Sequence, residues 1–148
     1  PSAITRLIEL GVPSYLINAT LLGVLAQRLT RTLCPHCRQP DESGEQKARL
    51  TEAIRPWNLT GEYGGYRAVG CLECRMTGYR GRMGLYELLM VTEALKKQIH
   101  DAPSMDVLRR QAVQDGMRPL RLAGALRVAE GVTTLPEVLA CTPLMSEI

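Results

Sequence analysis

The sequence contains two Cys-x-x-Cys pairs, and their spacing constrains the fold more than any other feature of the chain. The pairs are Cys34 with Cys37 and Cys71 with Cys74. Each pair predicts a tight turn that directs two sulfur atoms to one point, and the intervening segment is long enough to return the second turn to the first. We therefore predict that Cys34, Cys37, Cys71 and Cys74 bind one structural zinc ion, which closes this loop.

Other uses of these cysteines fit the sequence less well. Disulfides within each pair are an alternative, but a thioredoxin-like redox motif uses a single pair on a βαβ scaffold. Rubredoxin-like iron also uses two pairs, usually with glycine after each second cysteine, where this chain has Arg38 and Arg75. His36 is a further potential ligand, although its position inside the first turn favours exposure to solvent. Three aromatic residues between the pairs keep iron open as an alternative: Trp57, Tyr63 and Tyr66.

Length and composition indicate a globular chain. Its 148 residues, 45% of them hydrophobic, are enough for one domain or for a few small lobes. Five cysteines without a signal-peptide pattern favour a reducing compartment, in which thiols remain available to a metal. Cys141 lies outside the pairs and is predicted to be a buried thiol in a C-terminal helix. No apolar run approaches the ~20 residues that span a bilayer, so we expect membrane contact only through a partner.

The charge pattern gives little support to nucleic-acid binding. A net charge of +3 is too small to predict it, and the basic residues are dispersed except just after the second cysteine pair. Four thiolates on a divalent cation leave a net negative charge, which nearby cations would offset. We assign this role to Arg31, Arg38, Arg75, Arg80 and Arg82, with phosphate binding as the alternative.

The first 33 residues are predicted to be helices that close a larger domain. Residue 14 is a serine placed to cap a helix from residue 15 to about residue 31, whose apolar side chains cover most of its circumference. Such a helix needs partners on several sides, and we expect the earlier part of its domain to be absent. An apolar helical stripe precedes it, formed by Ile4, Leu7, Ile8 and Leu10.

Residues 34–75 are predicted to form a metal lobe. Residues 45–55 favour a short helix, and residues 61–70 favour irregular structure or a short strand. In residues 77–84, three glycines at intervals of three predict tight turns, and the segment lacks the ending of a phosphate-binding P-loop. Residues 85–91 are an apolar run that predicts a buried strand.

From residue 92 onward the sequence predicts helices, which we expect to form an autonomous lobe over residues 92–140. Thr92 and Ser104 are candidate N-caps, and residues 134–137 match a capping box. Gly116 and Gly131 are expected at helix C-termini, and Pro119 suits a first turn. The predicted class is mainly α with a small β component. The apolar faces of the lobe are assigned to Leu108, Ala112, Val113, Leu120, Ala123 and Leu126.

The order of several segments is more specific than the cysteine pairs alone. These segments are residues 3–12, 25–31, the two cysteine pairs, and residues 77–82, 84–89, 120–124 and 129–135. Together they resemble the C-terminal third of type II secretion ATPases, the general secretion pathway protein E family, with type IV pilus assembly ATPases next. The resemblance covers essentially the whole chain.

This resemblance implies three parts and a motor function. Residues 1–33 would end a RecA-like ATPase domain, residues 34–75 would be the zinc-binding lobe, and residues 76–148 would be a strand with a C-terminal helical lobe. The family is a homo-hexameric bacterial motor, cytoplasmic and peripheral to the inner membrane, that uses ATP hydrolysis for pseudopilus assembly and protein secretion. The implied partners are other subunits, the cytoplasmic domain of an inner-membrane anchoring protein and the platform protein, without nucleic acid or direct membrane insertion.

One departure from the family pattern limits what these residues do alone. The 148 residues contain no Walker A motif, Walker B motif or histidine box, which in the family lie upstream. We therefore expect ATP and magnesium to bind only in a longer parent ATPase, and we assign no catalytic or nucleotide-binding residue here. Two other functions remain as alternatives: a zinc-knuckle module that binds nucleic acid, and a stand-alone metal redox protein.

Overall fold

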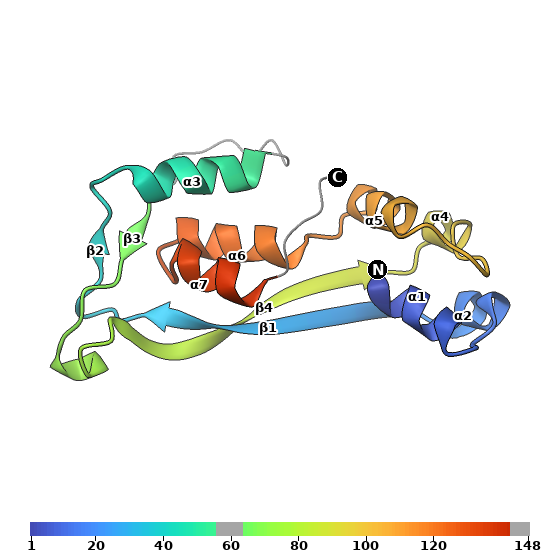
Figure 1. The fold of residues 1–148 in the computed structure, drawn as a ribbon, viewed down its shortest axis with the longest axis horizontal. Helices are drawn as coiled ribbons and strands as arrows, with labels where there is room; N and C mark the ends of the chain where they lie inside the picture. The colour runs from blue at the N-terminus through green and yellow to red at the C-terminus, as the bar shows by residue number, and fades with distance from the viewer. Residues whose placement is uncertain (56–63, 143–148) are drawn as a thin grey trace. The chain divides into compact units, whose positions relative to one another are not determined.

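The computed structural model describes residues 1–55 and 64–142 (Figure 1). These residues form seven α-helices and two two-stranded sheets, which confirms the predicted combination of helices with a small β component. Their contacts divide them into two compact units. We call residues 1–26 and 87–119 the helical unit, and residues 27–55, 64–86 and 120–142 the cysteine unit.

The helical unit is organised around one apolar core. Ile4, Leu95 and Leu108 are fully buried in it, and Ile17 and Leu89 are nearly so. Apolar residues recur along each short helix at a spacing that places them on one side of it, and this side packs into the core. The unit contains α1 (Ser2–Glu9), α2 (Ser14–Thr20), α4 (Glu93–Lys96), α5 (Met105–Gln114), the start of β1 (Gly23–Leu33) and the end of β4 (Tyr79–Met90).

The cysteine unit contains helices on one side of the paired strands β1 and β4, with α6 and α7 lying between these strands and α3 (Figure 1). A second, short pair joins β2 to β3, with Gln39 opposite Arg67 and Pro40 opposite Tyr66. The remaining elements of the unit are α3 (Glu45–Ile54), β2 (Gln39–Pro40), β3 (Tyr66–Arg67), the 3-10 turn η2 (Leu72–Cys74), α6 (Leu120–Ala129) and α7 (Leu135–Cys141).

A glycine lets α6 pack closely inside the cysteine unit. A Cβ atom at Gly124 would lie 2.3 Å from Cγ1 of Val138 in α7 and 3.1 Å from Cδ1 of Leu85 in β4. Both of these side chains are fully buried or nearly so. Gly124 is therefore the point at which α6, α7 and the strand meet.

The predicted long helix over residues 15–31 is wrong. The helix α2 ends at Thr20, and the chain enters β1 at Gly23. The amide of Val91 donates to the carbonyl of Leu22 at 3.0 Å, which starts the pairing of β1 with β4. The partner strand begins 46 residues after β1 ends, so its pairing with β1 outweighs the local helical pattern, and nothing in residues 15–31 themselves indicates it.

The predicted cap at Ser14 is also wrong. Pro13 holds the N-cap position of α2, and no side chain caps this helix. The hydroxyl of Ser14 instead donates to the carboxylate of Asp101 at 2.8 Å. Residues 1–33 are thus two short helices and a strand, and no long closing helix is present among them.

The strand β4 is longer and more exposed than the buried strand predicted over residues 85–91. It begins at Tyr79, so it includes Gly81 and Gly84, where the sequence predicts turns. Its side chains alternate, with Leu85 and Leu89 buried and the residues between and beside them wholly or partly exposed. Such alternation is typical of a strand with one buried face.

Most of the other predicted elements are present. The helix expected in residues 45–55 is confirmed by α3, and the short strand expected in residues 61–70 is confirmed by β3, although residues 61–63 lie outside the described residues. Gly116 and Gly131 follow α5 and α6 with φ of 97° and 70°, as expected for helix C-termini. Pro119 lies directly before the first residue of α6.

The predicted helix caps are only partly correct. Thr92 is confirmed, because its hydroxyl accepts the amide of Leu95 at 3.1 Å. Ser104 occupies the N-cap position of α5 without a side-chain cap bond. The capping box at residues 134–137 is wrong, because the side chains of Thr134 and Glu137 bind other residues.

The helices that follow residue 92 are divided between the two units. The short helices α4 and α5 pack in the helical unit, whereas α6 and α7 pack in the cysteine unit. The domain boundaries predicted at residues 33 and 75 stay a prediction. In α6 the predicted burial of Leu120 is confirmed, whereas Ala123 and Leu126 are only partly buried. The other buried residues of this helix are Leu122, Gly124, Ala125 and Val128.

Among the described residues, no helix combines the length and the apolar character that crossing a membrane requires.

Candidate metal centre

The four cysteines of the predicted zinc site come together in the cysteine unit. Cys34 directly follows β1, and Cys37 lies in the turn after it. Cys71 precedes the single turn η2, and Cys74 ends it. The four Sγ atoms all lie within 4.8 Å of one another. The two turns predicted from the Cys-x-x-Cys spacing thus direct their sulfurs to one point.

The distances between the sulfur atoms fit a tetrahedral metal site. They are 3.9 Å from Cys34 to Cys71, 3.8 Å from Cys37 to Cys74 and 3.7 Å from Cys71 to Cys74. Four thiolates at a zinc–sulfur distance of about 2.3 Å stand about 3.8 Å apart at the corners of a tetrahedron. A disulfide would need about 2.05 Å, and all the cysteines are free thiols. The alternative of a disulfide within each pair is therefore wrong for this structure.

Backbone amides point toward two of the sulfurs. The amide of Gly70 donates to Sγ of Cys37 at 3.3 Å, and the amides of Cys71 and Gly78 donate to Sγ of Cys74 at 3.2 Å each. Amide donors stabilise a thiolate. Burial alone would raise the pKa of Cys74, but these two amide donors, together with the thiols of Cys71 and Cys37, lower it to about 6. Burial raises the pKa of Cys37 to about 11 despite the donor from Gly70.

Two glycines of this site were not assigned to it by sequence analysis. Gly70 has a φ of 116°, and a Cβ atom there would lie 2.8 Å from the carbonyl oxygen of Met76. Gly78 has a φ of 77°, and its Cβ atom would lie 2.6 Å from Cβ of Ala68. Another residue at either position would be strained and crowded. Their positions, directly before Cys71 and four residues after Cys74, are the signal that could have identified them.

The donor set has the character of a structural site. Cys34 and Cys74 are buried and the other two cysteines are partly exposed, so four protein ligands would leave no open position for a substrate. His36 is exposed and lies outside the cluster, in agreement with the prediction that it faces solvent. The same sulfur arrangement also suits iron. Three aromatic residues between the pairs supported iron as an alternative metal. Two of them, Trp57 and Tyr63, lie outside the described residues.

Tyr66 and Cys141 are not part of the four-cysteine cluster and have contacts of their own. The guanidinium of Arg38 lies 4.9 Å from the centre of the Tyr66 ring and donates to the carbonyl of Gly131. Cys141 ends α7 and is only partly buried, which differs from the buried thiol predicted for it. Burial nevertheless raises the pKa of Cys141, and its thiol lies 3.5 Å from the carbonyl of Val138.

Among the described residues, no hydrogen bond joins an arginine near the second cysteine pair to any of the four sulfurs. Arg80 pairs with Glu73 at 3.2 Å, and Arg31 pairs with Glu137. The cluster instead receives its hydrogen bonds from backbone amides, as described above. Charge compensation by the arginines remains a prediction.

Comparisons with known proteins agree over nearly the whole chain. A family model described as "Type II/IV secretion system protein" matches residues 1–140. The type IV pilus assembly ATPase TfpB of Acinetobacter baylyi is 45% identical over 148 residues, which are 97% of this chain and 24% of that protein. The type II secretion system ATPase E of Vibrio cholerae is 39% identical over 140 residues, covering 95% of this chain and 27% of that protein. Type II secretion system protein E of Pseudomonas aeruginosa is 41% identical over 142 residues with the same coverage. The chain thus spans about a quarter of the length of these relatives.

Proposed function

Because the chain belongs to the family of type II/IV secretion system proteins, we propose that it is the C-terminal part of a type II secretion ATPase. The parent protein would couple ATP hydrolysis to pseudopilus assembly and protein secretion, as a homo-hexamer on the cytoplasmic side of the bacterial inner membrane. The observation that carries this proposal is identity of 39% and 41% to two type II secretion proteins over 95% of the chain. The zinc-knuckle alternative gains no support from this match.

The cysteine cluster would serve this protein as a structural zinc site. Within residues 34–40 and 64–78, which we call the cysteine lobe, the buried residues are Cys34, Gly65, Cys74 and Gly78. Glycines and cysteines bury too little apolar surface to stabilise a fold by themselves. A bound zinc ion would supply the missing stabilisation by joining the two turns through Cys34, Cys37, Cys71 and Cys74.

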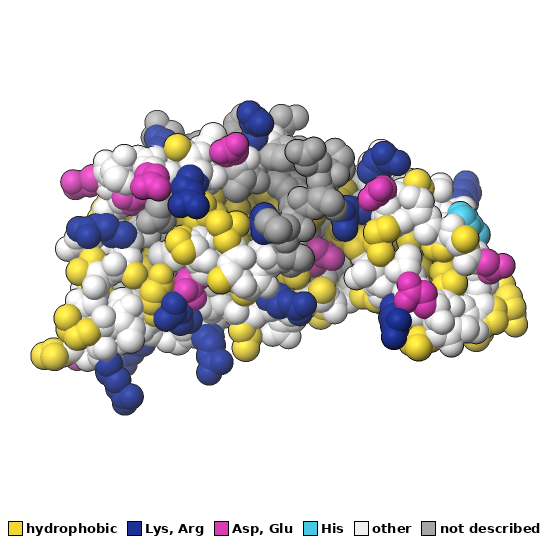
Figure 2. All heavy atoms as spheres, viewed as in Figure 1, with side chains coloured by type: hydrophobic (Ala, Val, Ile, Leu, Met, Phe, Trp, Pro, Cys, Tyr) yellow, Lys and Arg dark blue, Asp and Glu magenta, His cyan; other side chains and the backbone are white. Residues whose placement is uncertain are grey.

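The turn that carries the second cysteine pair offers a surface for assembly or partner binding. Leu72 is 90% exposed and Met76 is 66% exposed, and Val69 is also exposed. Hydrophobic side chains gather at the end of the cysteine unit where η2 lies, with basic side chains beside them (Figures 1 and 2). Exposed apolar side chains that cluster beside charged ones are typical of protein interfaces. We propose that other subunits or inner-membrane secretion proteins contact this surface, without nucleic acid.

The test of this surface uses the full-length protein with the double substitution Leu72→Ser and Met76→Ser. Neither side chain is buried, so metal content and ATP turnover should remain at the unmodified level while secretion falls. Leu10→Ser is the matched control, because Leu10 is 65% exposed but lies in the helical unit. Unchanged secretion in the double variant would exclude the surface from partner binding.

The absence of nucleotide-binding motifs from the sequence gives a second test. Phosphoryl transfer needs a phosphate-binding loop and residues that hold magnesium, and residues 1–148 contain no Walker A or Walker B motif. The full-length protein should hydrolyse ATP, and the 148-residue chain should not. Turnover by the isolated chain, purified free of the parent, would contradict the assignment of nucleotide chemistry to the rest of the protein.

A further inference from the structure

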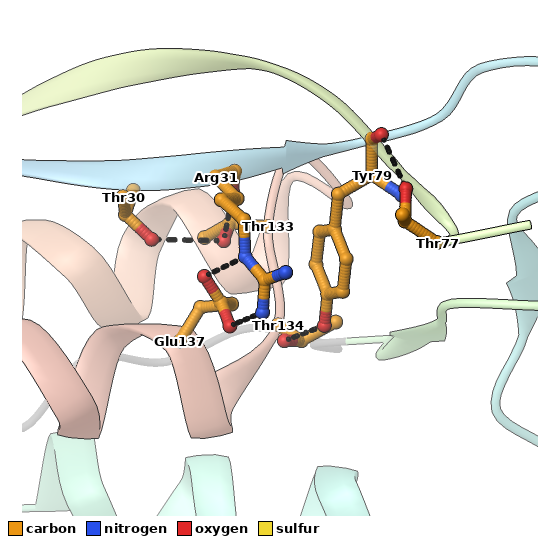
Figure 3. A network of polar contacts seen from close by, with 7 residues as sticks. All are labelled: Thr30, Arg31, Thr77, Tyr79, Thr133, Thr134 and Glu137. Atoms are coloured by element: carbon orange, nitrogen blue, oxygen red, sulfur yellow. Dashed lines mark hydrogen bonds and ion pairs between the residues drawn. The ribbon is translucent and has the colours of Figure 1, made fainter. Parts of the chain in front are cut away.

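A network of polar contacts connects the strands beside the cysteines to the start of α7 (Figure 3). It lies entirely within the cysteine unit. The strand β1 contributes Thr30 and Arg31, and β4 contributes Tyr79. These residues contact Thr133, Thr134 and Glu137, which lie before and within the first turn of α7. We call the six residues the α7 latch.

One contact of the α7 latch is an ion pair between Arg31 and Glu137. The guanidinium donates two hydrogen bonds to the carboxylate, at 2.8 Å and 2.5 Å, and also lies 4.3 Å from the centre of the Tyr79 ring. Two parallel charge-assisted hydrogen bonds fix orientation as well as distance. The hydrogen bond from Arg31 lowers the pKa of Glu137, so this carboxylate is charged at neutral pH.

Hydroxyl groups make the remaining contacts of the latch. The hydroxyls of Tyr79 and Thr134 share a hydrogen bond of 2.9 Å. The hydroxyl of Thr133 donates to the carbonyl of Arg31 at 2.7 Å and lies 3.3 Å from that of Thr30, and both threonines are buried. A buried hydroxyl that loses its hydrogen-bond partner destabilises a fold, so the contacts of Thr30 and Thr133 contribute to holding α7 in place.

The latch residues are tied to the cysteine cluster by short chain connections. The amide of Cys34 donates to the carbonyl of Gly78 at 2.9 Å, which joins the end of β1 to the segment that enters β4. The hydroxyl of Thr77 donates to the carbonyl of Cys74 at 2.6 Å and accepts the amide of Tyr79 at 3.2 Å. The cluster therefore fixes the two strand ends from which Arg31 and Tyr79 reach α7.

We propose that the α7 latch couples metal binding at the cysteine cluster to the order of α7. Bound metal holds the strand ends in place, which keeps Arg31 and Tyr79 positioned against Thr134 and Glu137. Thermodynamic linkage makes the coupling reciprocal, so an intact latch raises metal affinity and a broken latch lowers it. The inference rests on the metal site of the proposed function and adds to it a defined route from the cysteines to a helix.

The test compares the zinc affinity of matched variants of the 148-residue chain, measured by competition with a chromogenic chelator. Glu137→Gln keeps the shape of the side chain and removes its charge, and Tyr79→Phe removes only the hydroxyl. The control is Glu130→Gln, because Glu130 is exposed, directly follows α6, and pairs at 2.6 Å with Arg127, which is not one of the latch residues. Substitutions next to metal ligands weaken binding about 10- to 100-fold, so we expect about a three- to tenfold loss for these more distant changes.

Hydrogen exchange of α7 provides the reciprocal measurement. In the unmodified chain, removal of zinc should speed exchange of the α7 amides, and in Glu137→Gln these amides should already exchange faster with zinc bound. Equal zinc affinity in Glu137→Gln, Tyr79→Phe and the Glu130→Gln control would overturn the coupling and leave the metal site intact. Failure of the unmodified chain to bind zinc would overturn the metal site itself, and the coupling with it. The two failures are therefore distinguishable.

Discussion

The helical unit and the cysteine lobe differ in the residues that each of them buries. In the helical unit, side chains from four helices and two strand ends share one apolar core, with Ile4, Leu95 and Leu108 fully buried. In the cysteine lobe, the buried residues are cysteines and glycines. The first region can fold by burying apolar surface, whereas we propose that the second depends on a metal ion that links its two cysteine turns. On the proposed function, the two regions therefore draw their stability from different sources.

The largest expected effect comes from the substitution Cys71→Ser. Serine is nearly the same size but is a poor ligand for zinc, so the cysteine lobe should lose its metal and its order while the helical unit remains folded. Limited proteolysis should cut within residues 34–40 and 64–78 and spare residues 87–119. Cys141→Ser is the control, since Cys141 is also partly exposed but lies outside the cluster. Equal resistance of the two variants would show that the lobe does not depend on its cysteines.

The reverse effect is expected from Leu108→Ala in the helical unit. Leu108 is fully buried, and removing such a side chain from a core destabilises a protein by about 2–5 kcal/mol. Denaturant unfolding followed by hydrogen exchange should place the loss in the helical unit, and zinc affinity should not change. A parallel fall in zinc affinity would mean that the two regions are not independent.

A smaller effect is expected where α6 meets α7 in the cysteine unit. Gly124→Ala would place a Cβ atom 2.3 Å from the Val138 side chain, which must then shift. Overpacking of this kind costs about 1–3 kcal/mol. The melting temperature should fall, and the double variant Gly124→Ala with Val138→Ala should recover part of the loss. If the alanine at 124 is neutral, the close packing of α6 on α7 is not needed for stability.

The smallest effect is expected at a helix cap of the helical unit. Thr92→Ala removes the hydroxyl that accepts the Leu95 amide and that also contacts Asp115 at 2.5 Å. Loss of an N-cap costs about 1 kcal/mol. Ser104→Ala is the matched control, because Ser104 occupies an N-cap position without a side-chain cap bond and should cost less than half as much. Chemical denaturation of both variants measures this difference, and equal losses would contradict the cap assignment.

The candidate site could be predicted largely from the sequence because its information is local. Two residues between the cysteines of each pair set the geometry of each turn, whatever the rest of the chain does. Gly70 and Gly78 escaped the sequence analysis because their role depends on the close approach of Met76 and Ala68, which are brought near only by the folded turn.

The fold was less predictable where partners are distant in the sequence. Residues 21–31 have a helical distribution of apolar residues, yet they pair with a strand that begins at Tyr79. Residues 134–137 also have partners that are distant in the sequence. They match a capping box locally, but Glu137 binds Arg31 and Thr134 binds Tyr79. The short helices of the helical unit followed their local signals more closely, as Thr92 and Gly116 illustrate.

The most direct test of the central claim measures zinc content and hydrogen exchange on the same sample of the unmodified chain, before and after treatment with a chelator. We expect one zinc ion per chain, and we expect zinc removal to expose the amides of the cysteine lobe while those around the core of the helical unit stay protected. A coloured, redox-active metal in place of zinc would identify the site as an iron centre. A metal-free chain with the same protection in the cysteine lobe, or loss of protection in both regions together, would contradict the claim.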